Sequence, residues 1–133
     1  MRALFPEINE SWSSIWYPSR RGEGVEEVHA RTAGFLEAFL PEVERRMPTT
    51  DSRILLVGHA ATVITLTREL LGDLQLPLRV GCCTLTELKP KPERKILGGW
   101  RGEKLATGEH LRDGIQRDWG FEDIEVEDGK VYI

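Results

Sequence analysis

An uninterrupted apolar run, followed at once by a histidine and a helical pattern, constrains this chain most, in the stretch Arg53–Asp73. Residues 54–57 are apolar at every position (Ile-Leu-Leu-Val), which is typical of a strand covered on both faces. Apolar residues then recur at helical spacing as far as Gly72, and glycine is favoured just after a helix end. We therefore expect a buried strand, a turn that carries His59, and a helix that ends at Gly72.

His59 is placed by this pattern at the start of a helix. A helix N-terminus has unpaired backbone N–H groups and a partial positive charge, which together favour an anion. An imidazole at that position suits phosphate chemistry. The alternative is a core histidine whose ring is satisfied by the backbone, and the residues of this stretch leave both interpretations open.

Composition and charge limit the class of protein. A chain of 133 residues with 40% hydrophobic residues predicts one domain with its own core. There is no secretory pattern and no run of about 18 apolar residues, so we expect a cytoplasmic or nuclear protein without a membrane partner. Cys82 and Cys83 are adjacent, lack metal-ligand spacing and are expected to be reduced and buried. The net charge of −4 argues against direct nucleic-acid binding.

Charge is distributed unevenly near the C-terminus. Residues 89–104 contain six basic and two acidic residues, whereas residues 118–130 contain six acidic and one basic residue. Two solvated faces explain this pattern, and a docking surface for a partner is the alternative.

The remaining elements predict an α/β fold with a small, mostly parallel core. Apolar spacing predicts a helix over 22–47, with a kink or break caused by Pro41, after an aromatic loop over 1–21 that has one helical turn near Glu10. Alternation predicts a strand over 83–89 with an antiparallel partner over 94–100. We also expect a short helix near Glu109 and a short strand over 130–133. The C-terminal part is therefore expected to be an antiparallel β element.

Two motifs that place chemistry between a strand and a helix do not fit residues 58–62, Gly-His-Ala-Ala-Thr. The nucleophile elbow of α/β-hydrolases needs Gly-x-Ser-x-Gly, and here alanine stands at the serine position. A phosphate-binding loop needs Gly-Lys-Ser/Thr, which the chain lacks.

The stretch LLVGHAATVITLTRELLG instead resembles the second signature of the histidine phosphatase superfamily, also called phosphoglycerate-mutase-like. Upstream, Tyr17-Pro18, Gly22-Glu23-Gly24, Glu27 and Arg31 resemble the family segment Y-P … G-E-S … D-x-x-x-R, with glycine in place of its serine. Downstream, Gly81 and residues 83–88 resemble the next strand. The similarity covers about residues 17–89 and implies a three-layer α/β sandwich.

In this family a histidine of an Arg-His-Gly motif attacks phosphorus, and cations around the phosphoryl oxygens stabilise the transition state. The chain has no Arg-His-Gly, and His29 and His110 do not match the nucleophile. The resemblance implies that His59 is the second catalytic histidine. It also implies candidate phosphate contacts with no metal or cofactor: His59, Ala60, Arg20, Arg21 and Arg31.

The alternatives to phosphate binding are structural: Arg20 and Arg21 could lie in a solvated turn, and Arg31 could form an ion pair on its helix. We expect residues 1–133 to form a single, incomplete domain of this family, lacking the first strand of the sheet and inactive alone. The strand at 54–57 would then have an open edge, so the isolated chain would be marginally stable or would associate.

One subgroup resembles the chain in finer detail: the phosphatase-like tau subunits of the fungal RNA polymerase III assembly factor. The matching segments are WSSIWYPSRRGE over 12–23, EEVHAR over 26–31, and the spaced residues Gly114, Arg117, Trp119 and Phe121. This resemblance implies a non-catalytic subunit that acts through protein partners, as an alternative to phosphomonoester hydrolysis.

Overall fold

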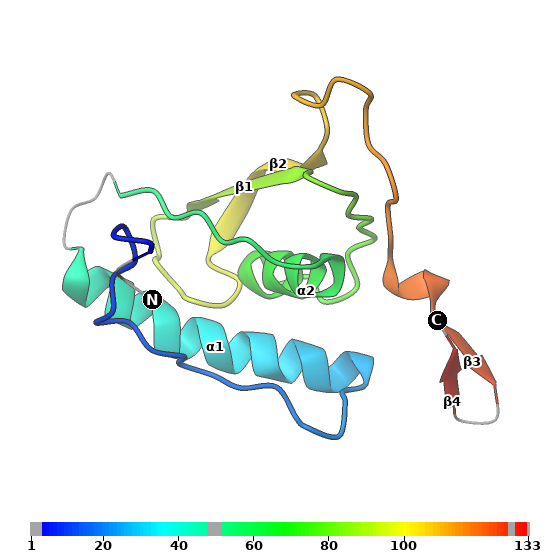
Figure 1. Cartoon of the computed structure of the whole chain (residues 1–133), viewed down its shortest axis with the longest axis horizontal. Coiled ribbons are helices and arrows are strands. Elements are labelled where there is room, and N and C mark those ends of the chain that lie inside the picture. The colour runs from blue at the N-terminus through cyan, green and yellow to red at the C-terminus, as the bar shows by residue number, and fades with distance from the viewer. Residues whose placement is uncertain (1–3, 48–51, 128–129, 133) are drawn as a thin grey trace.

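The computed structural model describes residues 4–47, 52–127 and 130–132. Its elements, in chain order, are α1 (Val25–Arg46), α2 (Ala60–Leu71), β1 (Leu85–Pro90), β2 (Trp100–Thr107), the short 3₁₀ helix η1 (Phe121–Asp123), β3 (Glu125–Glu127) and β4 (Lys130–Tyr132). Figure 1 shows α2 between α1 on one side and the β1–β2 sheet on the other.

Helix α1 confirms most of the predicted helix over 22–47. It begins at Val25, where the side chain of Glu27 reaches back and accepts a hydrogen bond of 2.7 Å from the backbone N–H of Gly24. Acidic residues in the first turn and Arg45 and Arg46 in the last turn complement the helix dipole. The predicted break at Pro41 is wrong, because α1 continues through this exposed residue.

The two helices meet through polar as well as apolar side chains. The hydroxyl groups of Thr32 and Thr65 lie 2.8 Å apart across the contact, and both residues are buried. Leu36 on α1 and Ile64 on α2 have no exposed surface. On its C-terminal side, α2 ends at Gly72 in the left-handed conformation (φ 77°), as the sequence predicts.

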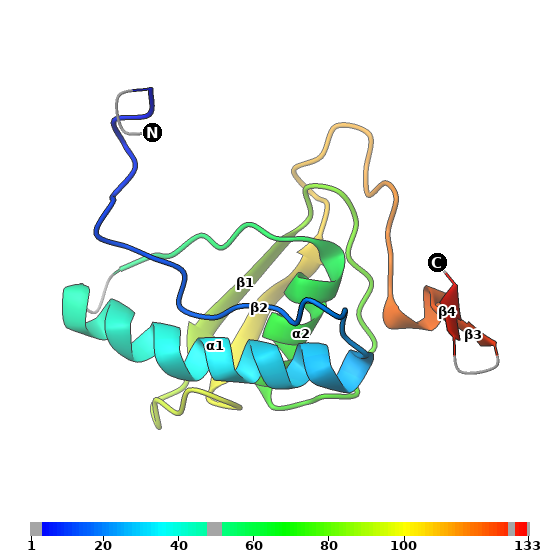
Figure 2. The same ribbon diagram turned by 60° about the horizontal axis from the view of Figure 1, so that its bottom comes forward.

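The N-terminal segment packs on α1 through Trp12, which confirms the predicted aromatic loop only in part, because Phe5, Trp16 and Tyr17 are 54%, 49% and 72% exposed. Trp12 contacts Phe39, with ring centroids 5.8 Å apart, and its ring lies 4.0 Å from the guanidinium carbon of Arg46. The predicted helical turn near Glu10 is a simple turn, closed by a bond from Trp12 N–H to Asn9 O. Residues 12–24 run back along α1: Figure 1 shows them on the side of α1 opposite α2, and in the view of Figure 2 they cross in front of α2.

The predicted buried strand at 54–57 is wrong in this structure. Residues 52–59 form no strand, and no parallel pairing occurs among the described residues. Leu55 is 76% exposed and Val57 is 90% exposed. The physical reason is the absence of a neighbour, since a strand is completed by ladder hydrogen bonds and β1 makes its ladder with β2. The expected parallel core is therefore replaced by an antiparallel pair.

The antiparallel pair is confirmed, but its second strand lies later in the chain than predicted. β1 pairs with β2 in a register that sets Lys89 opposite Arg101 and Pro90 opposite Trp100, with irregularities on either side of Glu87. The segment predicted as the partner, 94–100, is mostly a loop. This loop brings Gly98 close to Gly72. A Cβ added to Gly72 would lie only 2.9 Å from the Cα of Gly98. A helix end and a loop thus approach at two glycines.

The core lies between α2 and the sheet, built from Ile64, Leu78, Val80 and Ala106. The chain then returns to this core, because Val80 and Trp119 exchange backbone hydrogen bonds of 2.9 and 3.0 Å. The predicted short helix near Glu109 is a turn, closed by Leu111 N–H to Gly108 O.

At the C-terminus, β3 and β4 form a separate antiparallel hairpin. The predicted strand over 130–133 is confirmed for 130–132, and Ile133 lies outside the described residues.

Candidate functional site

His59 occupies the residue just before α2, as the sequence predicts. Its backbone is extended (φ −87°, ψ 164°), and its carbonyl accepts the first helical hydrogen bond, 2.9 Å from the N–H of Val63. The imidazole is exposed and makes no hydrogen bond or ion pair within the described part of the chain. Ala60 is half-buried in the first turn. The imidazole therefore stands beside the open N–H groups of a helix start.

The guanidinium group of Arg31 forms an ion pair with a carboxylate. Its Nε donates to Glu23 Oε1 at 2.7 Å, and the two side chains are only 24% and 13% exposed. This pair joins the first part of α1 to the segment that precedes it. The guanidinium is therefore held by an internal counter-charge.

Arg20 and Arg21 lie in the turn before α1 and are exposed. Between described residues, the turn shows one hydrogen bond, from the backbone N–H of Arg21 to the side-chain hydroxyl of Ser19 at 3.2 Å, and it does not involve either guanidinium. Figure 1 shows this turn on the side of α1 that faces away from α2. No hydrogen bond or ion pair among residues 4–47 and 52–127 joins these arginines or Arg31 to His59. The structure thus brings His59 and Ala60 together and leaves the three arginines elsewhere.

Two surface hollows lie near the N-terminal segment. One is lined by residues 6–11 and the other by Trp12, Ser13, Ile15, Ala38, Glu42 and Arg46. Neither is lined by His59 or by the three candidate arginines.

A buried titratable pair between the helices was missed by sequence reasoning. His29 donates or accepts through Nδ1, 2.9 Å from Val25 O, whereas its Nε2 is buried without a partner among the described residues. Glu69 on α2 is 8% exposed, and burial raises the pKa of its carboxyl group, while His29 opposes this rise. The ring of Phe121 lies beside that of His29, with ring centroids 5.8 Å apart. Only the tertiary contact shows this group, because the helical pattern places either residue equally well on a surface.

Arg79 forms the densest ionic cluster. It donates to Asp118 at 2.6 Å, to Glu122 at 2.7 Å and to Asp123 at 2.7 Å. These hydrogen bonds, that of Asp123 first, raise the pKa of Arg79. The sequence gives no signal for this cluster, because Arg79 lies 39 positions before Asp118. The cluster fastens residues 118–123 beside the Val80–Trp119 bridge, so its geometry serves structure.

In the parts of the chain that the structure describes, no three His, Cys, Asp or Glu side chains are arranged so that they could hold a metal ion. Cys82 and Cys83 are free, as predicted, but they are exposed, so the prediction that they are buried is wrong. They lie in the turn that leads into β1, where Cys83 has a positive φ of 57°. None of the described helices is both long and apolar enough to cross a membrane.

Comparison with known proteins supports the resemblance drawn from the motifs. The transcription factor tau 55 kDa subunit of Saccharomyces cerevisiae is 38% identical over 65 residues, which are 49% of this chain and 15% of that protein. The chain thus covers a small part of that relative. The family model of the histidine phosphatase superfamily (branch 1) matches residues 1–103. Because this match includes more than half of the sequence, the chain belongs to the histidine phosphatase superfamily.

Proposed function

We propose that this chain is a phosphatase-like domain that acts through protein contacts and does not hydrolyse phosphomonoesters by itself. One observation carries the proposal: the imidazole of His59 is exposed, and no described cation makes a contact with it. Transfer of a phosphoryl group develops charge on its oxygens, and rate acceleration depends on donors already placed around them.

The arginines named by the motifs do not supply those donors here. Arg31 is engaged by Glu23 at 2.7 Å, so recruiting it would leave a half-buried carboxylate without its counter-charge. Arg20 and Arg21 are exposed in the turn before α1, and no hydrogen bond or ion pair between described residues joins them to His59. The motif Arg-His-Gly, which supplies the nucleophile in the family, does not occur in the 133 residues.

Protein contact is supported by two findings. The similar yeast protein is described as a transcription factor subunit, a role that depends on other subunits. The apolar segment 54–57 is exposed directly before His59, and exposed apolar surface of this kind marks interaction sites. In this proposal the segment becomes the inner strand of the family's three-layer sandwich when another strand pairs with it. The chain would then act in the nucleus, within an RNA polymerase III factor as the finer motifs imply.

Family membership and the position of His59 favour a second candidate, hydrolysis through a phosphohistidine. For the chain alone it predicts hydrolysis that depends on His59, because the family's Arg-His-Gly motif does not occur in the 133 residues. His59 and Ala60 would then bind the phosphate, together with the arginines after a rearrangement.

Hydrolysis of p-nitrophenyl phosphate by the purified chain separates the two candidates. The matched variants are His59→Ala and His110→Ala, because His110 is also exposed but its Nε2 is bound 2.8 Å from Cys83 O, away from α2. We expect none of the three proteins to exceed the buffer rate. A wild-type rate that falls about tenfold or more in His59→Ala, but not in His110→Ala, would overturn the proposal.

A further inference from the structure

The lysines of this chain are concentrated at one place. Four of its five lysines lie in residues 89–104, which form the end of β1, the following loop and the first half of β2. Two arginines of the same segment complete what we call the cationic hairpin, whose basic residues are Lys89, Lys91, Arg94, Lys95, Arg101 and Lys104.

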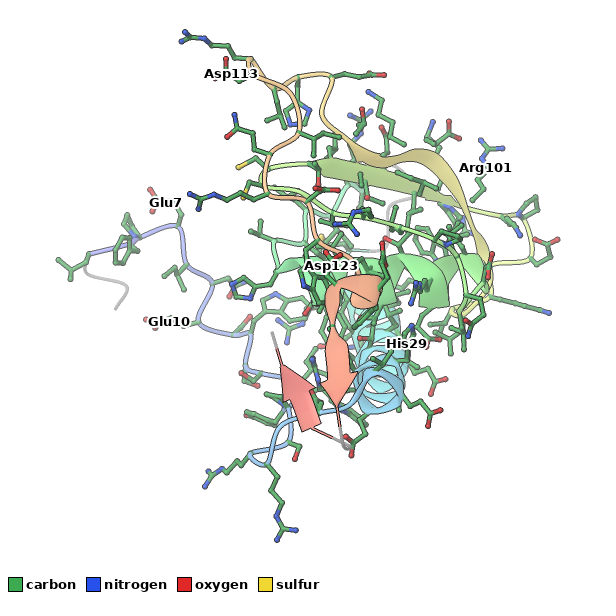
Figure 3. All side chains as sticks on the ribbon, turned by 90° about the vertical axis from the view of Figure 1, so that its right-hand side faces the viewer. Glu7, Glu10, His29, Arg101, Asp113 and Asp123 are labelled. Carbon is green, nitrogen blue, oxygen red and sulfur yellow. The ribbon has the colours of Figure 1, made fainter. Side chains whose placement is uncertain are left out.

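The register of the sheet places two of these charges face to face. Lys89 is directly opposite Arg101, and both residues are exposed. Directly opposed residues of an antiparallel pair share one face of the sheet, and like charges in this arrangement destabilise it. The neighbouring residue Leu88, whose side chain points to the opposite face of the sheet, is half-buried. The pair therefore lies on the outer face, and Figure 3 shows Arg101 directed away from the body.

Internal carboxylates leave most of this charge unbalanced. The single ion pair formed by the hairpin's basic residues within the described chain joins Arg101 to Glu103 at 3.0 Å. Helix α1 provides the contrast, because Arg31, Arg45 and Arg46 each contact a glutamate at 3.0 Å or less. Lys89 and the four other basic residues of the hairpin have no ion pair among the described residues, so only Arg101 is neutralised within the chain. An anionic partner would offset the local cost of this unbalanced charge.

From this placement, we propose that the outer face of the cationic hairpin binds a short, extended, carboxylate-rich segment of a partner protein. A strand of six residues such as β1 spans about 20 Å, so the segment is about six residues long. The partner is a protein, a point that rests on the proposed function. A nucleic acid is disfavoured because the whole chain carries a net charge of −4 and a polyanion would extend beyond this patch.

A second copy of the chain is also disfavoured as the partner. Its acidic residues near the C-terminus would be the natural ligand, but Asp118, Glu122 and Asp123 already accept hydrogen bonds from Arg79. Binding to a second copy would require these carboxylates to give up their hydrogen bonds with Arg79. The acidic segment is therefore expected to come from a different protein.

Fluorescence anisotropy with a labelled peptide of about eight glutamates tests the proposal on the full chain. The variant is Lys89→Gln/Arg101→Gln, and the matched control is Arg112→Gln/Arg117→Gln, two exposed arginines in the loop after β2. We expect binding at low salt that weakens about tenfold or more in the hairpin variant and remains unchanged in the control. The thermal midpoint of the hairpin variant should not fall, because the substitution removes a like-charge pair.

Four outcomes would overturn the proposal. They are no peptide binding at low salt, equal binding by the hairpin variant, tighter binding of a labelled DNA duplex than of the peptide, and self-association that is lost in the hairpin variant. The assay contains no phosphomonoester, so its failure is distinct from detection of phosphatase activity, which would overturn the proposed function instead.

Discussion

Helix α2 and the segment before it are both apolar and adjacent in sequence, yet they differ completely in burial. Ile64 in α2 has no exposed surface, whereas Val57, seven positions earlier, is 90% exposed. Helix α2 completes its own backbone hydrogen bonds and packs between α1 and β2. Segment 54–57 needs another strand for its hydrogen bonds, and none of the described strands pairs with it.

The difference teaches that an apolar run predicts a need for a partner and does not fix where the partner is. A helix satisfies its backbone within the segment, so it requires only a surface to pack on. A strand requires a second backbone at about 4.8 Å. Among the described residues, α2 has found its surface and segment 54–57 has not found its second backbone.

The substitutions Ile64→Ala and Leu55→Ala break this comparison most directly. Ile64→Ala leaves a cavity in the core and should lower the free energy of unfolding by about 2–5 kcal/mol. Leu55→Ala removes a side chain that is 76% exposed and should change it by less than about 0.5 kcal/mol. Urea unfolding of dilute protein measures both values. Equal losses in the two variants would show that segment 54–57 is buried in solution.

Two glycines sharpen the comparison for the end of α2. Gly72 and Gly114 both have a positive φ, 77° and 74°, but only at Gly72 would a Cβ meet backbone, 2.9 Å from Gly98 Cα. Gly114→Ala should cost about 1 kcal/mol for the left-handed conformation alone. Gly72→Ala should cost roughly 2–4 kcal/mol, because the loop must also move. Thermal unfolding measures the difference, and equal costs would contradict the close approach of α2 to this loop.

Elements that complete themselves locally were predictable from the sequence. Helix α1 and the end of α2 at Gly72 follow from apolar spacing and local capping. The second strand was misplaced because residues 94–99 form a loop in which Gly98 lies against Gly72. Pro41 was predicted to cause a kink or break, and the break does not occur, because α1 continues through it. The position of the second strand was missed because a distant contact decided it.

For the candidate site too, features set by neighbouring residues were predictable, and features set by contacts between distant residues were not. The sequence placed His59 correctly before a helix, because that position depends only on neighbouring residues. It grouped Arg20, Arg21 and Arg31 with His59 through motifs alone, and this grouping stays a prediction: no hydrogen bond or ion pair between described residues joins them, and Arg31 pairs with Glu23. The His29–Glu69 group was not found, because its members are 40 positions apart and meet only when α1 packs on α2.

The threonine contact tests how firmly α2 is held on α1. The hydroxyl oxygen of Thr32 also lies 2.8 Å from Val28 O, and the hydroxyl oxygen of Thr65 lies 3.1 Å from both Ala61 O and Thr62 O. Each hydroxyl has one proton, so at most one of them donates across the helices while the other donates within its own helix. Thr32→Val or Thr65→Val should each cost about 1 kcal/mol, and the double variant less than their sum. A double-mutant cycle by urea unfolding measures this coupling, and strict additivity would contradict it.

The smallest effect is expected where the C-terminal segment is fastened by Arg79. The hydrogen bond from Arg79, followed by that from the N–H of Gly120, lowers the pKa of Asp123 below its ordinary value of 3.8. The backbone N–H of Glu122, followed by Arg79, lowers the pKa of the Glu122 carboxyl group below its ordinary value of 4.5. A lowered folded-state pKa contributes stability that is present above these ordinary values and is lost as the pH falls through the lowered ones. The Val80–Trp119 bridge should therefore loosen on acidification.

The variant Arg79→Gln isolates this contribution, because it keeps the backbone bridge and removes the cation that three carboxylates share. NMR shifts of the Val80 and Trp119 amides, followed from about pH 6 to about pH 3, should move in the wild type and less in the variant. Because the cluster is exposed, about 0.5 M sodium chloride should reduce the difference between the proteins. Ile64 shows the contrast, since its burial depends on no charge and its amide should not respond to salt. Identical titrations of the two proteins would mean that the backbone bridge and the packing of Trp119, not Arg79, hold the segment in place.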